Sequence, residues 1–162
     1  MPTEYVEDKE MMDAVTEMLG DPKFTEFNPI REHEVKIDVR SCVRTDKHGE
    51  NQKAKAEPIT LKKVGQAERS IVDTDYILIV DNSAWAESND VQRNAIIHRG
   101  LMKIDIEAGE GKIKVGTRKP DVVEFTETIV RFGAYRECIL NLRDAMTLAS
   151  KQVARKMQIE NA

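Results

Sequence analysis

Hydrophobic and polar positions follow two different periods along the chain, and the period of two marks the strands. Apolar and charged residues alternate across Glu34–Arg44, which is typical of a half-buried strand with one charged face. Ile77, Leu78, Ile79 and Val80 are consecutive, so the sequence predicts a strand over Tyr76–Val80 that is buried on both faces. Ile59–Val64 is predicted as a second short strand, and Ile113 with Val115 suggests another.

Spacings of three and four predict the helices. The predicted helices and the signals that bound them are Glu4–Leu19, ended by Gly20 and Pro22; Val91 to about Glu107, capped by Ser88–Asn89–Asp90; a helix that starts at Pro120 and stops at Gly133; and a long amphipathic helix over about 135–158. Methionines recur on the first helix, and we interpret them as core filling rather than as a partner groove. Gly100 interrupts the second helix at a cost of about 1 kcal/mol relative to alanine and therefore needs an explanation.

A polar stretch over about 45–58, with alanine as its main small apolar residue, predicts an exposed, mobile loop. Asp81–Asn82 is predicted to end its strand as a turn, with Trp85 packing nearby. No repeat or composition break divides the 162 residues, so we expect a single α+β domain over 1–162.

Composition narrows the classes of function. A net charge of −4 argues against a general nucleic-acid binder. No apolar run approaches the roughly 20 residues of a membrane span, and the acidic N-terminus is unlike a signal peptide, so we expect a cytoplasmic protein. Cys42 and Cys138 are expected to be reduced, buried thiols.

The residues that carry chemistry elsewhere form no recognisable constellation here. His33, His48 and His98 are scattered without the spacing of metal ligands. No Gly-x-Ser-x-Gly and no phosphate-binding loop is present, and Gly109–Glu110–Gly111 alone is a turn. Neither cysteine has a histidine at motif distance.

Two groups of segments nevertheless resemble a known family. The first is Asp75–Val80, then Trp85, then Gln92–Ile97, and the second is Pro120–Phe125 followed by Val130–Gly133. Together they resemble the Putative phage metallopeptidase family, in which a buried strand and a tryptophan precede an active helix of the form Gln-Arg-x-Ala-Leu-Leu-Asp-His-Glu-Leu-Cys-His. The resemblance covers about Val35 to the C-terminal helix. It implies a minimal zincin-like fold: a small mixed sheet packed on a central helix, with additional N- and C-terminal helices.

The chemistry of that family does not carry over. In a zincin helix, two histidines four residues apart bind zinc, and the glutamate between them is the general base. Aligned without gaps, the first histidine falls on Arg99, the glutamate on Gly100 and the second histidine on Lys103, and a downstream histidine falls on Pro120. Shifting the register by one residue places His98, Arg99 and Met102 at the three positions, which is no better.

The substitutions suggest a surface rather than a metal site. Arg99 and Lys103 would place positive charge where the family holds Zn²⁺, and Asp121 and Glu124 of the next helix would pair with them. The alternative is that both cations are solvated on a helix surface. We therefore name Arg99, Gly100, Lys103, Asp121 and Glu124 as a candidate binding surface, with no catalytic residue, no metal ligand and no cofactor.

Three functions stay open at this point. The first is a catalytically inactive metallopeptidase-like protein, phage- or prophage-encoded as the resemblance implies, which binds a host or phage protein, for example as an inhibitor of a host enzyme or defence system. The second is a metal-dependent peptidase with a relocated site of Asp105, Glu107, Asp121 and Glu124. The third is a nucleic-acid-associated accessory protein that uses the lysines of Thr45–Lys63. The sequence names neither the partner nor the oligomeric state.

Overall fold

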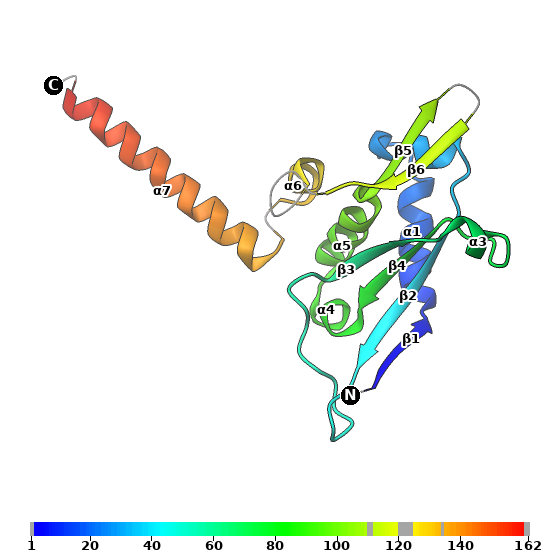
Figure 1. The fold of residues 1–162 in the computed structure, drawn as a ribbon. Coiled ribbons are helices and arrows are strands. Elements are labelled where there is room, and N and C mark those ends of the chain that lie inside the picture. The colour runs from blue at the N-terminus through cyan, green and yellow to red at the C-terminus, as the bar shows by residue number, and fades with distance from the viewer. Residues whose placement is uncertain (1, 110–111, 120–124, 134, 161–162) are drawn as a thin grey trace.

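A mixed sheet organises the protein. The computed structural model describes residues 2–109, 112–119, 125–133 and 135–160. Within these ranges the main sheet consists of β1 (Thr3–Glu7), β2 (Ile37–Arg44), β3 (Ile59–Lys63) and β4 (Tyr76–Asp81), in the order β1-β2-β4-β3. β2 and β4 run parallel, whereas β1 and β3 pair antiparallel with their neighbours (Figure 1). The strand order places β3 at one edge of the sheet.

A separate hairpin is joined to this sheet by one tyrosine. β5 (Ile104–Gly109) and β6 (Lys112–Thr117) pair antiparallel. The Tyr76 hydroxyl donates a 2.7 Å hydrogen bond to the Gly116 carbonyl oxygen and is completely buried. Burial raises the pKa of Tyr76 to about 12, because the charged phenolate is disfavoured away from water. The hydroxyl therefore stays protonated and can hold the hairpin against β4.

Helices pack against one face of the sheet, and the last helix extends away from it. Their bounds are α1 (Lys9–Gly20), η1 (a 3₁₀ turn, Thr25–Phe27), α2 (Asn28–Glu32), α3 (Gln66–Arg69), α4 (Asn82–Glu87), α5 (Asp90–Met102), α6 (Thr126–Phe132) and α7 (Glu137–Glu160). α1 and α5 pack against the sheet, and α7 projects away from the rest of the molecule (Figure 1). This arrangement confirms the predicted α+β class, with a mixed sheet, a central helix and a long C-terminal helix.

The core lies between the sheet and the two helices. Its fully or nearly fully buried side chains include Met11, Val15, Met18, Val39, Leu78, Val80, Ala95, Ile97 and Leu101. The methionines of α1 thus fill the core, as predicted. On β4, Tyr76, Leu78 and Val80 are buried, whereas Ile77 and Ile79 on the opposite face are half-buried. The prediction of burial on both faces was therefore wrong for the second face.

The first predicted helix begins later than expected. Thr3–Glu7 forms β1, which pairs with β2, so Glu4 is in a strand and not in a helix. The helix starts at Lys9 because the Asp8 carboxylate accepts a 3.0 Å hydrogen bond from the Met11 backbone N–H, which is an N-cap. All side chains of β1 are exposed. The sequence of this strand therefore shows no hydrophobic period from which it could be predicted.

The central helix is shorter than predicted. Its Asn89 cap is confirmed, but α5 ends at Met102 and Lys103 is its C-cap, whereas the prediction continued to about Glu107. Ile104 and Ile106 fit both a helix face and an alternating strand, and the hydrogen bonds of the β5–β6 hairpin decide for the strand. The predicted strand at Ile113–Val115 is confirmed as part of β6.

Two further predictions changed at helix starts. Asp81 does not end β4 in a turn: its carboxylate caps α4, which carries the buried Trp85. α6 begins at Thr126, because Phe125 before it is extended, and it ends at Gly133, whose positive φ provides the expected stop. The predicted start at Pro120 lies outside the described residues.

The 45–58 segment is exposed over its first half and held over its second half. The Lys55 backbone N–H donates to the buried Asp81 carboxylate at 3.0 Å, and the Ser83 hydroxyl donates to the Gln52 carbonyl oxygen at 2.6 Å. These bonds fix the chain just before Glu57, which lies two residues before β3. The mobility of the first half stays a prediction.

The remaining expectations concern cysteines and membranes. Cys42 is free and buried, as predicted, and the side chain of Cys138 lies outside the description. Among the helices that the structure describes, none combines the length and hydrophobicity of a membrane-spanning segment.

Candidate functional site

Arg99 on α5 is buried and ion-paired with a residue that precedes the edge strand. Its side chain is 5% exposed. Nε donates to Glu57 Oε1 at 2.9 Å and Nη2 donates to Glu57 Oε2 at 2.6 Å. Such a two-pronged contact matches the flat guanidinium to the flat carboxylate and is among the strongest polar contacts in proteins. The pair links the middle of α5 to the segment that leads into β3.

Lys103, the C-cap of α5 one turn after Arg99, contacts the same segment among the described residues. Its Nζ donates to the Ile59 carbonyl oxygen at 2.6 Å and lies 3.3 Å from Glu57 Oε1. Burial raises the pKa of Glu57, but the hydrogen bonds from Arg99 and the positive charge of Lys103 outweigh it, so the net pKa lies below its ordinary value. Glu57 is therefore ionised at neutral pH. We call Glu57, Arg99 and Lys103 the α5–β3 cluster.

Gly100 lies where α5 approaches β3 most closely. A methyl group added at Gly100 would lie 2.3 Å from Ile59 Cδ1, which real side-chain carbons essentially never do, and a tight 3.0 Å from Leu78 Cδ2. The packing therefore favours glycine, because any side chain at position 100 would force the end of the Ile59 side chain to move. This explains the glycine in the middle of the helix.

His98 lies on another side of the same helix in a second polar network. It is completely buried. Its Nε2 lies 2.7 Å from Glu26 Oε1, and its Nδ1 lies 2.6 Å from the Thr128 hydroxyl. An ionised carboxylate can only accept hydrogen bonds, so Nε2 carries a proton. The Phe24, Phe27 and Phe132 rings lie 5.1–5.9 Å from the imidazole centre and exclude water.

Glu26 joins this network to α6. Arg131 donates from Nε to Glu26 Oε1 at 2.5 Å and from Nη2 to Oε2 at 2.7 Å. Burial alone would raise the pKa of Glu26. Hydrogen bonds from Arg131 and His98 lower the pKa by more than burial raises it, and the net pKa is about 2. We call His98, Glu26, Thr128 and Arg131 the His98 network. It fastens η1, α5 and α6 to one another.

A cavity of about 310 Å³ lies beside the α5–β3 cluster. It is bounded by the segment on either side of Glu57, by α4, by the first turns of α5 and by the chain that leads into α7. Ala56, Pro58, Ile96 and Tyr135 give it apolar walls, and Lys55 and Glu87 give it charged ones. The cavity therefore has a lining of mixed apolar and charged residues.

The structure describes only part of the candidate surface predicted from the sequence. Arg99 and Gly100 are buried and Lys103 is largely covered, so the alternative in which both cations are solvated was wrong. Asp121 and Glu124 lie outside the described residues, so their pairing with the cations stays a prediction. That these five residues form a binding surface also stays a prediction.

The relocated metal site is described in half. Asp105 and Glu107 alternate on β5, so they share one face of the hairpin. Their proposed partners Asp121 and Glu124 are outside the description. Among the described residues, no group of three or more His, Cys, Asp or Glu side chains could hold a metal ion.

Sequence reasoning missed the acids that matter most. Glu57 was included in the polar stretch over about 45–58, and Glu26 belonged to no predicted element. Both lie outside the regular hydrophobic pattern, and their partners are 42 and 72 residues further along the chain. A signal was present in the buried cations of α5, since a buried Arg or His requires a polar partner.

A comparison with models of known families gives one match. The model described as Putative phage metallopeptidase matches residues 3–151, which is almost the whole chain. The chain belongs to this family. The match extends beyond the segments that carried the resemblance and includes β1, α1 and the first part of α7. Neither the curated proteins nor the solved structures contained a match.

Proposed function

We propose that this phage metallopeptidase-family protein is catalytically inactive and acts by binding another protein. We infer that it is phage- or prophage-encoded, works in the host cytoplasm, and holds a host protein, as an inhibitor of a host enzyme or defence system. The observation that carries the proposal is the α5–β3 cluster, which lies at the positions that the resemblance assigns to zinc chemistry.

The donor set at these positions does not fit zinc. Zinc sites use thiolate, imidazole and carboxylate ligands. Arg99 and Lys103 are cations at neutral pH, and both already donate hydrogen bonds to Glu57 or to the Ile59 carbonyl oxygen. A divalent ion beside two such cations would be repelled at short range. Positive charge from side chains therefore takes the place that the family's metal would occupy.

The same positions leave no space for a general base. The resemblance places the catalytic glutamate at Gly100, where Ile59 and Leu78 fill the space that its side chain would need. The Glu57 carboxylate is close by, but both of its oxygens accept hydrogen bonds from Arg99, and its lowered pKa makes it a poor proton acceptor. We derive no reaction step for this arrangement.

The cavity beside the cluster is the surface that we assign to partner binding. Its lining is held by hydrogen bonds from the Lys55 backbone N–H to Asp81, from Gln92 to the Tyr135 carbonyl oxygen and from Arg136 to the Ala56 carbonyl oxygen, so a partner would meet a preformed site. Its apolar walls favour an apolar side chain, and Lys55 and Glu87 at its border would select the neighbouring charges.

The two alternative functions have weaker support. A relocated metal site depends on Asp121 and Glu124, for which the structure offers no description, together with Asp105 and Glu107 from the hairpin. A nucleic-acid role depends on the lysines between Thr45 and Lys63. These lysines include Lys47, Lys53 and Lys62, which are exposed, but acids are interspersed among them and the net charge of the chain is −4.

Affinity capture from host lysate tests partner binding through the cavity. Ala56→Trp and Glu87→Arg alter two exposed positions that line the cavity without removing a core contact. Glu50→Arg, at an exposed position of the same segment, is the matched control. Circular dichroism confirms that each variant is folded before capture.

The expected result is one set of partners retained by the wild-type protein and by Glu50→Arg and lost by both cavity variants. Retention of the same partners by Ala56→Trp and Glu87→Arg would contradict the assignment of the cavity. Sequence-independent DNA in all eluates that disappears at moderate salt would count as a nonspecific electrostatic effect.

A further inference from the structure

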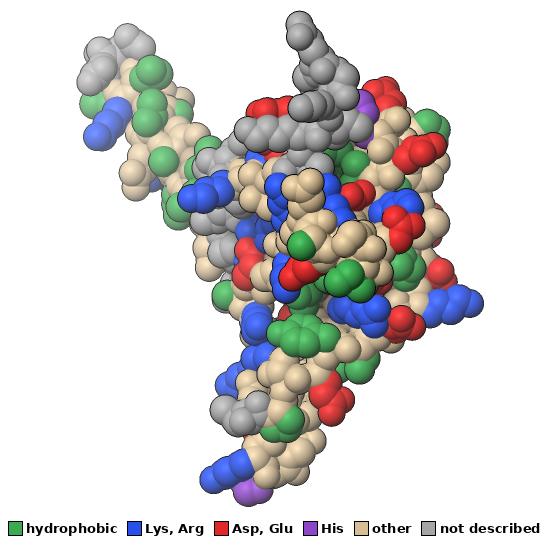
Figure 2. Space-filling view, turned by 45° about the vertical axis from the view of Figure 1, so that its right-hand side comes forward, with side chains coloured by type: hydrophobic (Ala, Val, Ile, Leu, Met, Phe, Trp, Pro, Cys, Tyr) green, Lys and Arg blue, Asp and Glu red, His purple; other side chains and the backbone are tan. Residues whose placement is uncertain are grey.

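α7 presents an apolar stripe that nothing else in the described chain covers. Leu142, Met146, Val153 and Met157 are 40%, 62%, 53% and 58% exposed. Their spacing of four, seven and four residues places them on one side of the helix. Figure 2 shows hydrophobic side chains along the projecting helix. Helices in proteins gain most of their stability from packing, so a helix of this length is expected to lie against a partner surface.

The start of α7 is fixed, and this limits where the stripe can go. Tyr135 is buried, its carbonyl oxygen accepts a 3.2 Å hydrogen bond from Gln92 Nε2, and Arg136 donates to the Ala56 carbonyl oxygen. The helix begins directly afterwards and leads away from α1 and the sheet (Figure 1). With its start held in this way α7 points away from α1 of its own chain, which favours a receiving surface on another molecule.

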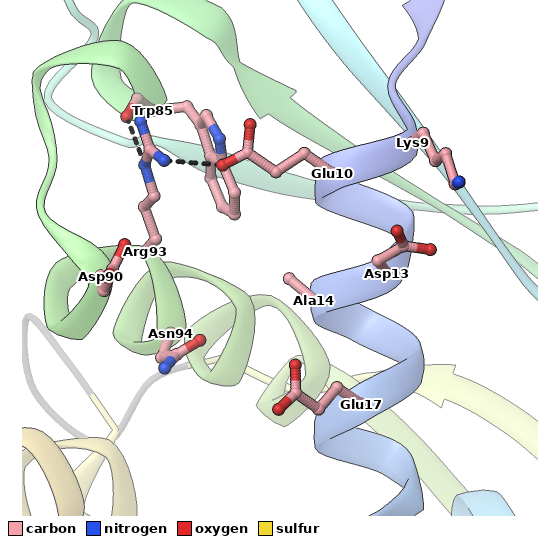
Figure 3. A pocket seen from close by; sticks show the side chains of 9 residues that line it. All are labelled: Lys9, Glu10, Asp13, Ala14, Glu17, Trp85, Asp90, Arg93 and Asn94. Carbon is pink, nitrogen blue, oxygen red and sulfur yellow. Dashed lines mark hydrogen bonds and ion pairs between the residues drawn. The ribbon is translucent and has the colours of Figure 1, made fainter.

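A groove between α1 and α5 has the shape for a helix. Two cavities of about 570 and 170 Å³ share Ala14, Glu17 and Asn94 and therefore form one continuous depression, which we call the α1–α5 groove. Trp85 borders one end and Phe24 the other. α1 has 12 residues, a length of about 18 Å, which equals the length of the last 12 residues of α7. Figure 3 shows the wider cavity between the two helices.

Acidic residues outnumber basic ones along the groove, whose lining also includes Lys9 and Lys23, whereas basic residues predominate in the second half of α7. Arg93 is ion-paired with Glu10 at 2.7 Å (Figure 3). Among the described residues, Asp13, Glu17 and Asp90 line the groove without an ion-pair partner. The second half of α7 carries Lys151, Arg155 and Lys156, all exposed, beside the stripe residues Val153 and Met157.

We propose that the second half of α7 docks in the α1–α5 groove of a second copy of this chain. Val153 and Met157 face the apolar floor, and the three cations meet the acidic side of α1, which is the usual arrangement of an amphipathic helix in a groove. Each copy has one helix and one groove, so two copies can exchange their helices reciprocally, and the proposal is this closed two-fold dimer. A pair of α7 helices is disfavoured, since their second halves carry the same charge.

Charge reversal tests the docking in the full-length protein by sedimentation velocity over a range of concentrations. The wild type is expected to sediment as a dimer. Asp13→Lys/Glu17→Lys and Lys151→Glu/Arg155→Glu are each expected to raise the dimer dissociation constant about tenfold or more, because each reverses several exposed ion pairs. Combining both pairs of substitutions in one chain restores opposite charges and should restore the dimer.

A matched control and a second measurement separate docking in the groove from a general effect of charge. Glu32→Lys/Glu50→Lys changes the net charge as much as the groove variant does, at exposed positions outside the groove, and should leave the dimer unchanged. A photo-crosslinking amino acid at Met157, in a mixture of isotope-labelled and unlabelled chains, should link α7 to α1 or α5 of the other copy. A monomeric wild type, failure of the combined variant to restore the dimer, or crosslinks between two α7 helices would each overturn the proposal.

Discussion

The two polar networks on α5 involve successive residues but differ in exposure. His98 is completely buried among aromatic rings, and its acid Glu26 is 13% exposed. Arg99 is nearly as inaccessible, but its acid Glu57 is 40% exposed, and Ala56 and Pro58 on either side of Glu57 line a cavity. The His98 network reaches the surface mainly through Arg131, whose side chain is 27% exposed, whereas in the α5–β3 cluster the acid itself is accessible to water.

The difference shows which part of the helix holds the fold and which part is available for binding. Polar networks in a water-excluded environment are strong when every member is satisfied and costly when one member is lost. Solvent weakens the contribution of a half-exposed pair. We therefore expect substitutions in the His98 network to affect stability more than equivalent substitutions in the α5–β3 cluster.

The largest effect is expected from restoring the family's acid at Gly100. Gly100→Glu would force a side chain against Ile59 and bury a negative charge, and together these should lower the free energy of unfolding by about 4 kcal/mol or more. Urea unfolding followed by circular dichroism measures the loss. The double variant Gly100→Glu/Ile59→Ala should recover part of it, and a single variant as stable as wild type would show that the space at Gly100 is not filled.

Glu26→Gln should have the next largest effect. It removes a carboxylate that accepts from both His98 and Arg131, so a loss of about 2–3 kcal/mol is expected in urea unfolding at pH 7. Val130→Ala, at a position of the same helix that is 79% exposed, serves as a control for general effects on α6.

The pH dependence provides an independent test of the same network. The pKa of Glu26 is about 2 in the folded protein and 4.5 without the contacts, so its stabilisation is complete above about pH 4.5 and is lost as the pH falls towards 2. One such group contributes a slope of about 1.4 kcal/mol per pH unit in that window. Glu26→Gln should reduce the slope by this amount; an unchanged slope would show that Glu26 is not the group responsible.

Glu57→Gln should cost less than Glu26→Gln. Arg99 is buried, but water reaches the Glu57 carboxylate, so a loss of about 1 kcal/mol is expected by the same measurement. Equal losses for the two substitutions would remove the distinction between an enclosed and an accessible network.

Lys103→Met should have the smallest effect. Methionine keeps most of the packing of the lysine stem and removes the hydrogen bond to Ile59 and the contact with Glu57, so a loss of about 0.5–1 kcal/mol is expected. A loss as large as that of Gly100→Glu would place Lys103 among the residues that hold the fold.

Helices and strands whose apolar residues follow one clear period could be predicted from the sequence. Segments whose apolar residues fit both the helical and the strand period could not. The buried faces of α1, β4 and α5 followed from their spacing. Ile104 and Ile106 satisfied both periods, so the boundary between α5 and β5 depended on hydrogen bonds with β6 that lie beyond local reading. β1 was missed because its exposed residues carry no pattern.

The sequence identified which residues of the candidate site differ from the family's zinc motif, but it did not identify the residues that they contact. The resemblance identified Arg99, Gly100 and Lys103 as the altered positions. Their partners Glu57 and Ile59 come from a segment about 40 residues away, and only the pairing of β3 with β4 brings that segment to α5. The reason for Gly100 was likewise a tertiary contact rather than a local conformation.

The most direct test of the central claim is the zinc content of the purified, untagged protein, measured by elemental analysis after equilibration with excess zinc and removal of free metal. We expect well below one zinc per chain for the wild type and for Arg99→Ala, which removes a cation without adding a ligand. A stoichiometric zinc content in the wild-type protein would contradict the proposal that the family's metal chemistry has been lost.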